Sequence, residues 1–242
     1  LIPGLLMAGR HRRTVVAWVL IVINAINLID GAHGLAGGTA LIMFGGIALA
    51  AGWSGDAITL NEALVVMGAL VGFLVWNYPR GRIFLGDAGA YFIGFMYAEL
   101  SIQLVTHNGG ISAWYVIMLA GYPMVAPRFA RYRRACMRRA SLLAPDWLHL
   151  PSLVFRRVAM PIERRRKRPS LRHANALVAP RLWLHSGLCF ALAVLFHDNT
   201  PALWGCLAGY TAFYVMRYRA LIRFAVRQAR RRARAAKEKT NA

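Results

Sequence analysis

Asp30 and Asp87 stand in two polar, glycine-rich segments, each of which interrupts a pair of strongly apolar runs. An aspartate at membrane depth is costly, and it usually marks a site for an ion, a proton or a substrate. In the first segment, Asn24, Asn27 and Asp30 follow one another at steps of three residues. This spacing predicts that two amides and one carboxylate share a face at the end of a helix. The glycines beside them allow the backbone to approach a bulky polar ligand closely.

These residue types are suited to a phosphorylated polar ligand. Amides can bind sugar hydroxyls, and a carboxylate can bind Mg²⁺ or an imide N–H. Asp87 begins a predicted helix, whose free N–H groups favour phosphate, and its carboxylate can ligate a Mg²⁺ ion that neutralises a diphosphate. Arg80 and Arg82 flank this turn as candidate phosphate clamps. The structural alternative is that the Asn and Asp side chains cap helix ends and that the arginines set membrane orientation.

The elements that must position these turns are predicted to be membrane helices. Of the 242 residues, 58% are hydrophobic, and the mean hydropathy is +0.43. Apolar runs of about twenty residues, the length that spans a bilayer, recur along the chain. We expect seven spans, over 14–29, 35–52, 62–78, 89–106, 111–127, 181–197 and 201–222. The predicted fold is all-α, a polytopic membrane helix bundle with a cytoplasm-facing groove.

Charge divides the predicted membrane protein into four regions. Residues 1–127 hold five spans and both motif turns, and 128–180 form a basic cytoplasmic loop. Residues 181–222 hold two further spans, and 223–242 form a basic cytoplasmic tail.

The basic residues also predict orientation. Three connections lack Lys and Arg and should be external, namely 52–62, 106–110 and 197–200. The opposite connections carry most of the basic residues and should be cytoplasmic, so both acidic turns open on the cytoplasmic side. The basic stretch 10–13 disagrees with this scheme, because it would lie outside. Either the first apolar run is re-entrant, or the amino-terminal stretch is not native to the domain.

The formal charge of +21 comes from 30 Lys and Arg against 9 Asp and Glu. Such a charge can indicate nucleic-acid binding, but here it is confined to loops and a tail without interleaved aromatics. We therefore expect no specific nucleic acid, and we expect the basic loops to lie beside anionic membrane lipid. Cys136, Cys189 and Cys206 are odd in number and widely spaced, which predicts neither a disulfide framework nor a zinc site.

Two motifs, in this order and at membrane turns, resemble a known family. Residues 24–31 read Asn-Ala-Ile-Asn-Leu-Ile-Asp-Gly, with Leu-Ala-Gly at 35–37, and residues 83–89 read Ile-Phe-Leu-Gly-Asp-Ala-Gly. They resemble the polyprenyl-phosphate N-acetylhexosamine-1-phosphate transferases of the glycosyltransferase 4 family, which includes phospho-N-acetylmuramoyl-pentapeptide transferase. The resemblance covers residues 14–155, with weaker continuity to the end.

The resemblance implies a Mg²⁺-dependent enzyme of cell-envelope polysaccharide synthesis, a multi-pass protein of the bacterial-type inner membrane. It would transfer a sugar 1-phosphate from a UDP-N-acetylhexosamine to a membrane polyprenyl phosphate and release UMP. Taken with the chemistry above, it assigns catalysis to Asp87 and His149, metal binding to Asp87 and Asp30, and substrate binding to Asn24, Asn27, Asp30, Arg80 and Arg82. The sugar, the lipid length and whether the chain forms a homo-oligomer stay open.

The sequence departs from the family pattern at several positions. His33 stands where the family has a second carboxylate, and Ala126 stands where it has an aspartate. Ser141, Ala144, Pro145 and Asp146 match the loop before the family's His-x-His-His cluster, of which only His149 is kept.

A family turn with adjacent aspartates has no counterpart upstream of Arg13, and the chain opens with Leu1 where a start Met would stand. These features favour a piece of a longer protein. They also leave two alternatives: a catalytically impaired homologue that binds a nucleotide-sugar or a partner, and a scaffold that binds anionic lipid.

Overall fold

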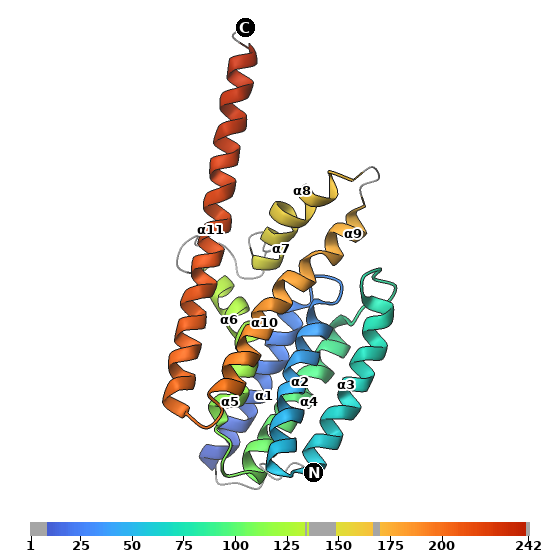
Figure 1. The fold of residues 1–242 in the computed structure, drawn as a ribbon, viewed down its shortest axis with the longest axis vertical. Helices are drawn as coiled ribbons and strands as arrows, with labels where there is room; N and C mark the ends of the chain where they lie inside the picture. The colour runs from blue at the N-terminus through green and yellow to red at the C-terminus, as the bar shows by residue number, and fades with distance from the viewer. Residues whose placement is uncertain (1–8, 134, 136–148, 167–169, 241–242) are drawn as a thin grey trace.

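A computed structural model of the chain describes residues 9–133, 135, 149–166 and 170–240, which form helices and no strands (Figure 1). In chain order the helices are α1 Gly9–Ile29, α2 Leu35–Ser54, α3 Ala57–Asn77, α4 Gly86–His107, α5 Ala113–Leu119, α6 Gly121–Tyr132, α7 Leu150–Val154, the π-helix η3 Phe155–Ala159, α8 Met160–Glu163, α9 Leu171–Ala176, α10 Val178–Leu195 and α11 Thr200–Thr240.

Five helical segments among the described residues are long and apolar enough to cross a membrane. They are 12–29, 35–54, 57–77, 86–107 and 171–195. The prediction of an all-α membrane helix bundle is therefore confirmed, although seven spans were expected. The predicted span over 201–222 lies within the long helix α11, and the one over 111–127 is split into the short helices α5 and α6.

The split between α5 and α6 follows from the local sequence. Pro123 has no N–H to donate to the carbonyl of Leu119, and its ring clashes with that carbonyl in a continuous α-helix. Helix α5 ends at Leu119, and Ala120 leaves the helical region with a ψ of 7°. Two helices too short to span a bilayer singly thus replace one predicted span.

Close helix packing holds the bundle together. Helix α1 packs along α4, α2 packs along α3, and α10 packs against α2. A Cβ on Gly94 would lie 2.6 Å from the Cα of Ile23, so α4 approaches the α1 backbone directly. A Cβ on Gly38 would overlap the indole of Trp183, which docks α10 on α2. Small residues allow such approach where lipid removes the hydrophobic drive between helices.

The connections sort to the two ends of the bundle as the charges predict. In Figure 1 the links after α2, α4 and α10 lie at the lower end, and the turns after α1 and α3 lie at the upper end with α7, α8 and α9. We name the lower end external and the upper end cytoplasmic, after the orientation that the basic residues predict. Helix α1 runs unbroken between them, so the re-entrant alternative for the first apolar run is wrong. The exposed side chains of Arg12 and Arg13 lie toward the external end.

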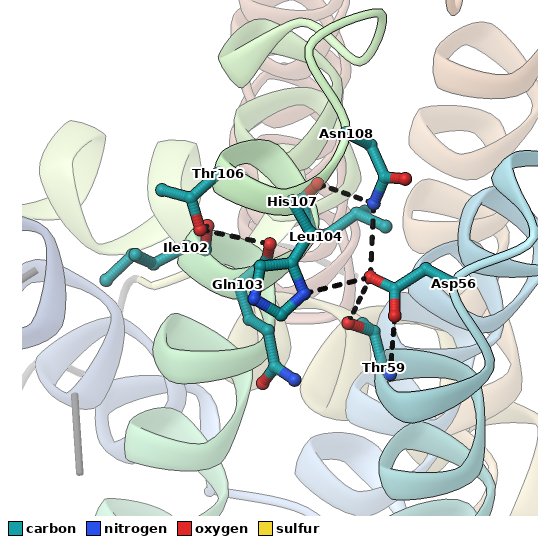
Figure 2. Close-up of polar contacts among 8 residues, drawn as sticks. All are labelled: Asp56, Thr59, Ile102, Gln103, Leu104, Thr106, His107 and Asn108. Carbon is teal, nitrogen blue, oxygen red and sulfur yellow. Dashed lines mark hydrogen bonds and ion pairs between the residues drawn. The ribbon is translucent and has the colours of Figure 1, made fainter. Parts of the chain in front are cut away.

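Asp56 joins the ends of α3 and α4 at the external end (Figure 2). Its Oδ1 accepts from the Thr59 N–H at 3.1 Å, which caps α3, and its Oδ2 accepts from Thr59 Oγ1 at 2.6 Å. Asn108 Nδ2 donates to the same carboxylate at 3.1 Å, and His107 Nδ1 lies 3.4 Å from Oδ2. Burial opposes ionisation of Asp56, but these hydrogen bonds and the nearby His107 outweigh it and lower its pKa.

Replacing Asp56 with Ala is expected to lower the free energy of unfolding by about 1–2 kcal/mol, because α3 loses its cap and α4 loses its tie to α3. An acid with a lowered pKa stabilises the fold above its unfolded pKa, and this contribution is lost as pH falls through the folded value. In detergent, the thermal unfolding midpoint of Asp56→Ala should therefore lie below that of the unmodified chain at neutral pH, and this difference should shrink in acid. Asp198→Ala, which removes an exposed carboxylate at the same end, is the control. Equal losses in both variants would contradict this account.

Candidate functional site

The two acidic turns meet at the cytoplasmic end. Asn27 Nδ2, in the last turn of α1, donates to Oδ1 of Asp87, in the first turn of α4, at 2.8 Å. Asp30 follows directly after α1. Burial raises the pKa of Asp30, and the negative charge of Asp87 raises it further. The two carboxylates are therefore close enough to repel, although they are far apart in sequence.

Asn77 links the two turns, and the sequence analysis did not identify this residue. Its side chain is 5% exposed at the end of α3. Oδ1 accepts from the N–H of Gly34 at 2.6 Å, and Nδ2 donates to the carbonyl of Ile83 at 2.7 Å. Gly34 has a φ of 77° and lies against the ring of Tyr78, so neither its conformation nor its space suits a side chain. One amide thus fixes the loop after Asp30 against the loop before Asp87.

His33 belongs to the first turn, and its ring contacts the second turn. Its N–H donates to Oδ1 of Asn175 on α9 at 2.8 Å, and its ring packs against Gly81. Burial lowers the pKa of His33, the charge of Arg172 lowers it further, and a hydrogen bond with Asn77 offsets part of the shift. The lowered pKa favours the neutral imidazole, in a place where the family pattern has a carboxylate.

Phe84 is a second residue that sequence reasoning passed over. Its ring is 73% exposed in the turn that leads to Asp87, and it meets the edge of the His33 ring at a centroid distance of 5.8 Å. The available signal in the sequence was its place in the second motif, three residues before Asp87. Its free face can stack on a flat ligand.

His149 approaches the first turn from the other side. Its Nε2 lies 3.9 Å from the place that a Cβ on Gly31 would take, and its Nδ1 lies 3.2 Å from Ser152 Oγ. His149 lines a cavity of about 320 Å³, whose walls also come from Leu28, Ile29, Ala126, Pro127, Ala130, Arg131, Leu150, Pro151 and Tyr214. Ala126, where the family has an aspartate, is thus an apolar wall residue.

Asn24 does not join this group. Its Oδ1 accepts from Arg131 Nη2 of α6 at 2.6 Å, so it faces α6, whereas Asn27 faces α4. The expectation of a single face for Asn24, Asn27 and Asp30 is therefore wrong. Each step of three residues turns a helix by about −60°, so Asn24 and Asp30 differ by about 120°.

Arg80 and Arg82 line a different surface from the carboxylates. Both are exposed and line a groove shared with α8 and α9, to which Asn27, Asp30 and Asp87 contribute nothing. Of the predicted site residues, the structure thus brings together Asn27, Asp30 and Asp87, with His149 next to them. Ser141, Ala144, Pro145 and Asp146 lie outside the described residues.

The oxygen atoms at the site fit a magnesium ion. Among the described residues, no cluster of three or more His, Cys, Asp and Glu side chains could hold a metal. Asp30 and Asp87 instead offer two carboxylates whose charges interact across the two turns. Mg²⁺ is commonly bound by one or two carboxylates, with water and substrate phosphate as its other ligands. A cation here would also relieve the repulsion that raises the pKa of Asp30.

Replacing Asp30 with Asn is expected to stabilise the metal-free protein at neutral pH. The pKa of Asp30 is raised in the folded state, so the folded state binds more protons than the unfolded state, and stability falls as pH rises through the interval between the two pKa values. The neutral amide removes this loss. Thermal unfolding without metal should show a higher midpoint for Asp30→Asn near pH 7 and a smaller difference in acid. A lower midpoint at neutral pH would contradict the repulsion.

Comparison with known proteins supports the motif assignment. Residues 9–105 match the family model described as glycosyl transferase family 4. A probable undecaprenyl-phosphate N-acetylglucosaminyl 1-phosphate transferase of Bacillus subtilis is 35% identical over 136 residues, which are 56% of this chain and 38% of that protein.

Two phospho-N-acetylmuramoyl-pentapeptide-transferases are similar over shorter stretches. The protein of Lacticaseibacillus paracasei is 40% identical over 90 residues, 37% of this chain and 28% of its own length. That of Oceanobacillus iheyensis is 46% identical over 83 residues, 34% of this chain and 25% of its own length. The chain thus spans well under half the length of these relatives, and no solved structure matches it.

The matched segment contains α1 to α4 and both acidic turns, so it includes the whole Asn27–Asp30–Asp87 group. The resemblance that the two motifs indicated is confirmed for residues 9–105, which match the model of glycosyl transferase family 4.

Proposed function

We propose that this protein transfers a sugar 1-phosphate from a UDP-N-acetylhexosamine to a polyprenyl phosphate at the cytoplasmic face of a bacterial inner membrane, in cell-wall polysaccharide synthesis. The observation that carries the proposal is the contact between Asn27 and Asp87, with Asp30 beside it, at the basic end of a membrane bundle. The named relatives act on undecaprenyl phosphate or on phospho-N-acetylmuramoyl-pentapeptide, which supports the same substrate classes here.

The donor side of the site is the surface formed by the two turns. Asp30 and Asp87 would hold the Mg²⁺ ion, and the amide of Asn27 keeps the Asp87 carboxylate oriented. When bound, Mg²⁺ supplies positive charge that neutralises the diphosphate and favours attack at phosphorus. The exposed ring of Phe84, backed by His33, offers a stacking surface for the uracil base.

The acceptor side is a groove between α1 and α6. It has a volume of about 330 Å³ and is lined by Leu20, Ile21, Asn24, Ala25, Leu28, Pro123, Met124, Pro127, Arg128 and Arg131. Its walls are mainly apolar, as a polyprenyl chain requires, and the two arginines suit its phosphate. Leu28, Pro127 and Arg131 also line the His149 cavity, so the groove leads toward the Asp30 turn.

The reaction needs one new bond and breaks one. An oxygen of the acceptor phosphate forms a P–O bond to the sugar-bearing phosphorus, and the P–O bond to UMP breaks. Because both substrates are anionic, the work of this chain is to position them and to screen their charges. Arg131 and His149 lie on the acceptor path and would orient the attacking phosphate, while Asp30 and Asp87 lie on the donor side.

A second candidate function is nucleotide-sugar binding without turnover. The observation that favours it is the replacement of family carboxylates by a neutral imidazole at His33 and a buried methyl group at Ala126. Binding of the donor needs only the two turns, whereas transfer needs the complete set of charged groups around both phosphates.

UMP release separates the two functions. The full chain in lipid nanodiscs would be given UDP-N-acetylglucosamine, undecaprenyl phosphate and Mg²⁺. Transfer predicts UMP release that needs both substrates and stops when EDTA removes the metal. Donor binding without UMP release would favour the second function, and the absence of both would contradict the proposal.

A further inference from the structure

A basic groove lies at the cytoplasmic end, apart from the acidic site. Arg80 and Arg82 line it from the turn after α3, and Arg166 and Arg172 line it from the segments that follow α8 and begin α9. Its volume is about 610 Å³, and its remaining walls come from Pro79, Glu163, Ser170 and His173. It shares no lining residue with the α1–α6 groove or with the His149 cavity.

Glu163, the one carboxylate among the described residues that line the groove, is already engaged. Glu163 is 2% exposed, and its Oε1 accepts from the N–H of Ser170 at 2.9 Å. Its Oε2 lies 3.6 Å from Arg166 Nη1, so it orients one arginine and ties α8 to the start of α9. Four arginines line the groove against this one acid, and their side chains are exposed. The groove therefore carries a surplus of positive charge that an anionic ligand can neutralise.

The geometry favours a phosphate group as that ligand. Guanidinium groups bind phosphate through paired N–H donors, and several arginines around one concavity can meet more than one oxygen. Arg82 is held over the ring of Trp76 at 5.6 Å, which limits the freedom that it would lose on binding. Helix α9, which carries Arg172, is held in place by the hydrogen bond from the His33 N–H to Asn175 Oδ1. This bond joins one wall of the groove to the turn after α1.

The surroundings favour a lipid as the source of the phosphate. Exposed apolar side chains lie close to the arginines in the chain: Trp76 at the end of α3, Ile83 in the turn after it, Ile162 in α8 and Leu171 at the start of α9. Large apolar side chains beside arginines at a span end are typical of the interface between hydrocarbon and headgroups. A groove for a soluble anion would need no such apolar rim.

We infer that the groove lined by Arg80, Arg82, Arg166 and Arg172 binds the phosphate headgroup of an anionic phospholipid of the cytoplasmic leaflet. The bound lipid would place its acyl chains along the exposed apolar side chains beside the groove. This site is separate from the transferase site and does not depend on whether the chain turns over a nucleotide-sugar.

Lipid retention tests this assignment. The full chain, purified in detergent, would be mixed with equal amounts of phosphatidylglycerol and phosphatidylcholine, and the retained lipid would be quantified by native mass spectrometry. The unmodified chain should prefer phosphatidylglycerol. The double variant Arg166→Gln/Arg172→Gln should retain less phosphatidylglycerol by a factor of about ten or more, since each basic side chain near the surface contributes about 1 kcal/mol.

Two matched variants control for charge and folding. Arg12→Gln/Arg13→Gln removes the same charge from exposed positions toward the external end and should keep the preference. Arg166→Lys/Arg172→Lys keeps the charge but not the paired donors, so it should lose less of the preference than the Gln variant does. Unchanged phosphatidylglycerol retention in the Gln double variant would overturn the proposal. So would complete displacement of the lipid by millimolar inorganic phosphate, which would indicate a soluble-anion site.

Discussion

Asp87→Asn is expected to reduce Mg²⁺-dependent UMP release by about a hundredfold or more. A metal that stabilises charge on a transferring phosphoryl group contributes several kcal/mol, and each 1.36 kcal/mol is tenfold in rate. Asp87 is exposed in the first turn of α4 and is oriented by the amide of Asn27, so its carboxylate is available to a cation. The amide variant keeps the shape of the side chain and its oxygen acceptor but removes the charge that binds the metal.

The control for Asp87→Asn is Asp198→Asn, which neutralises an exposed carboxylate at the external end. This control should release UMP at the unmodified rate. Thermal unfolding would show that both variants fold. An Asp87→Asn protein that folds and keeps more than half of the Mg²⁺-dependent rate would contradict the role of this carboxylate.

Asn77→Ala is expected to lower the free energy of unfolding by about 2–5 kcal/mol, since a buried polar group left without its partner costs about 1–3 kcal/mol. The substitution removes the acceptor of the Gly34 N–H and the donor to the Ile83 carbonyl together. Because these bonds join the loops that carry Asp30 and Asp87, UMP release should fall as well. Thermal unfolding in detergent and the UMP assay measure the two effects.

Asn61→Ala is the matched control for Asn77, because Asn61 is exposed on the same helix α3. It should unfold within about 0.5 kcal/mol of the unmodified chain, as surface substitutions usually do. Asn77→Asp keeps the acceptor for Gly34 but places a buried carboxylate against the Ile83 carbonyl, so it should be at least as destabilised as Asn77→Ala. A loss for Asn77→Ala no greater than that for Asn61→Ala would show that the two bonds do not hold the turns.

The sequence predicts that Asp30 and Asp87 lie at the same end of the bundle, because this depends only on the number of membrane spans between them. Two spans, α2 and α3, separate the turns, and two crossings return the chain to the same side of the bilayer. Basic residues then indicate which side that is. The apolar runs therefore fixed the helical class and the end of the bundle at which the site lies.

The details of the site depend on side-chain directions and tertiary packing, which the number and order of the spans do not predict. The facing of Asn24 toward Arg131 follows from helix rotation and from the position of α6. The bridge made by Asn77 requires both loops to be in place before its two partners exist. The position of Arg166 and Arg172 beside Arg80 depends on the path of short helices that carry little periodic signal.

The account depends on a divalent cation bound between Asp30 and Asp87. Mn²⁺ is visible by electron paramagnetic resonance and can stand in for Mg²⁺, so its binding to the full chain in nanodiscs with UDP-N-acetylglucosamine measures this directly. The structure predicts a bound Mn²⁺ signal that Asp198→Asn retains and that the double variant Asp30→Asn/Asp87→Asn loses. Equally tight Mn²⁺ binding in the folded double variant would contradict the account.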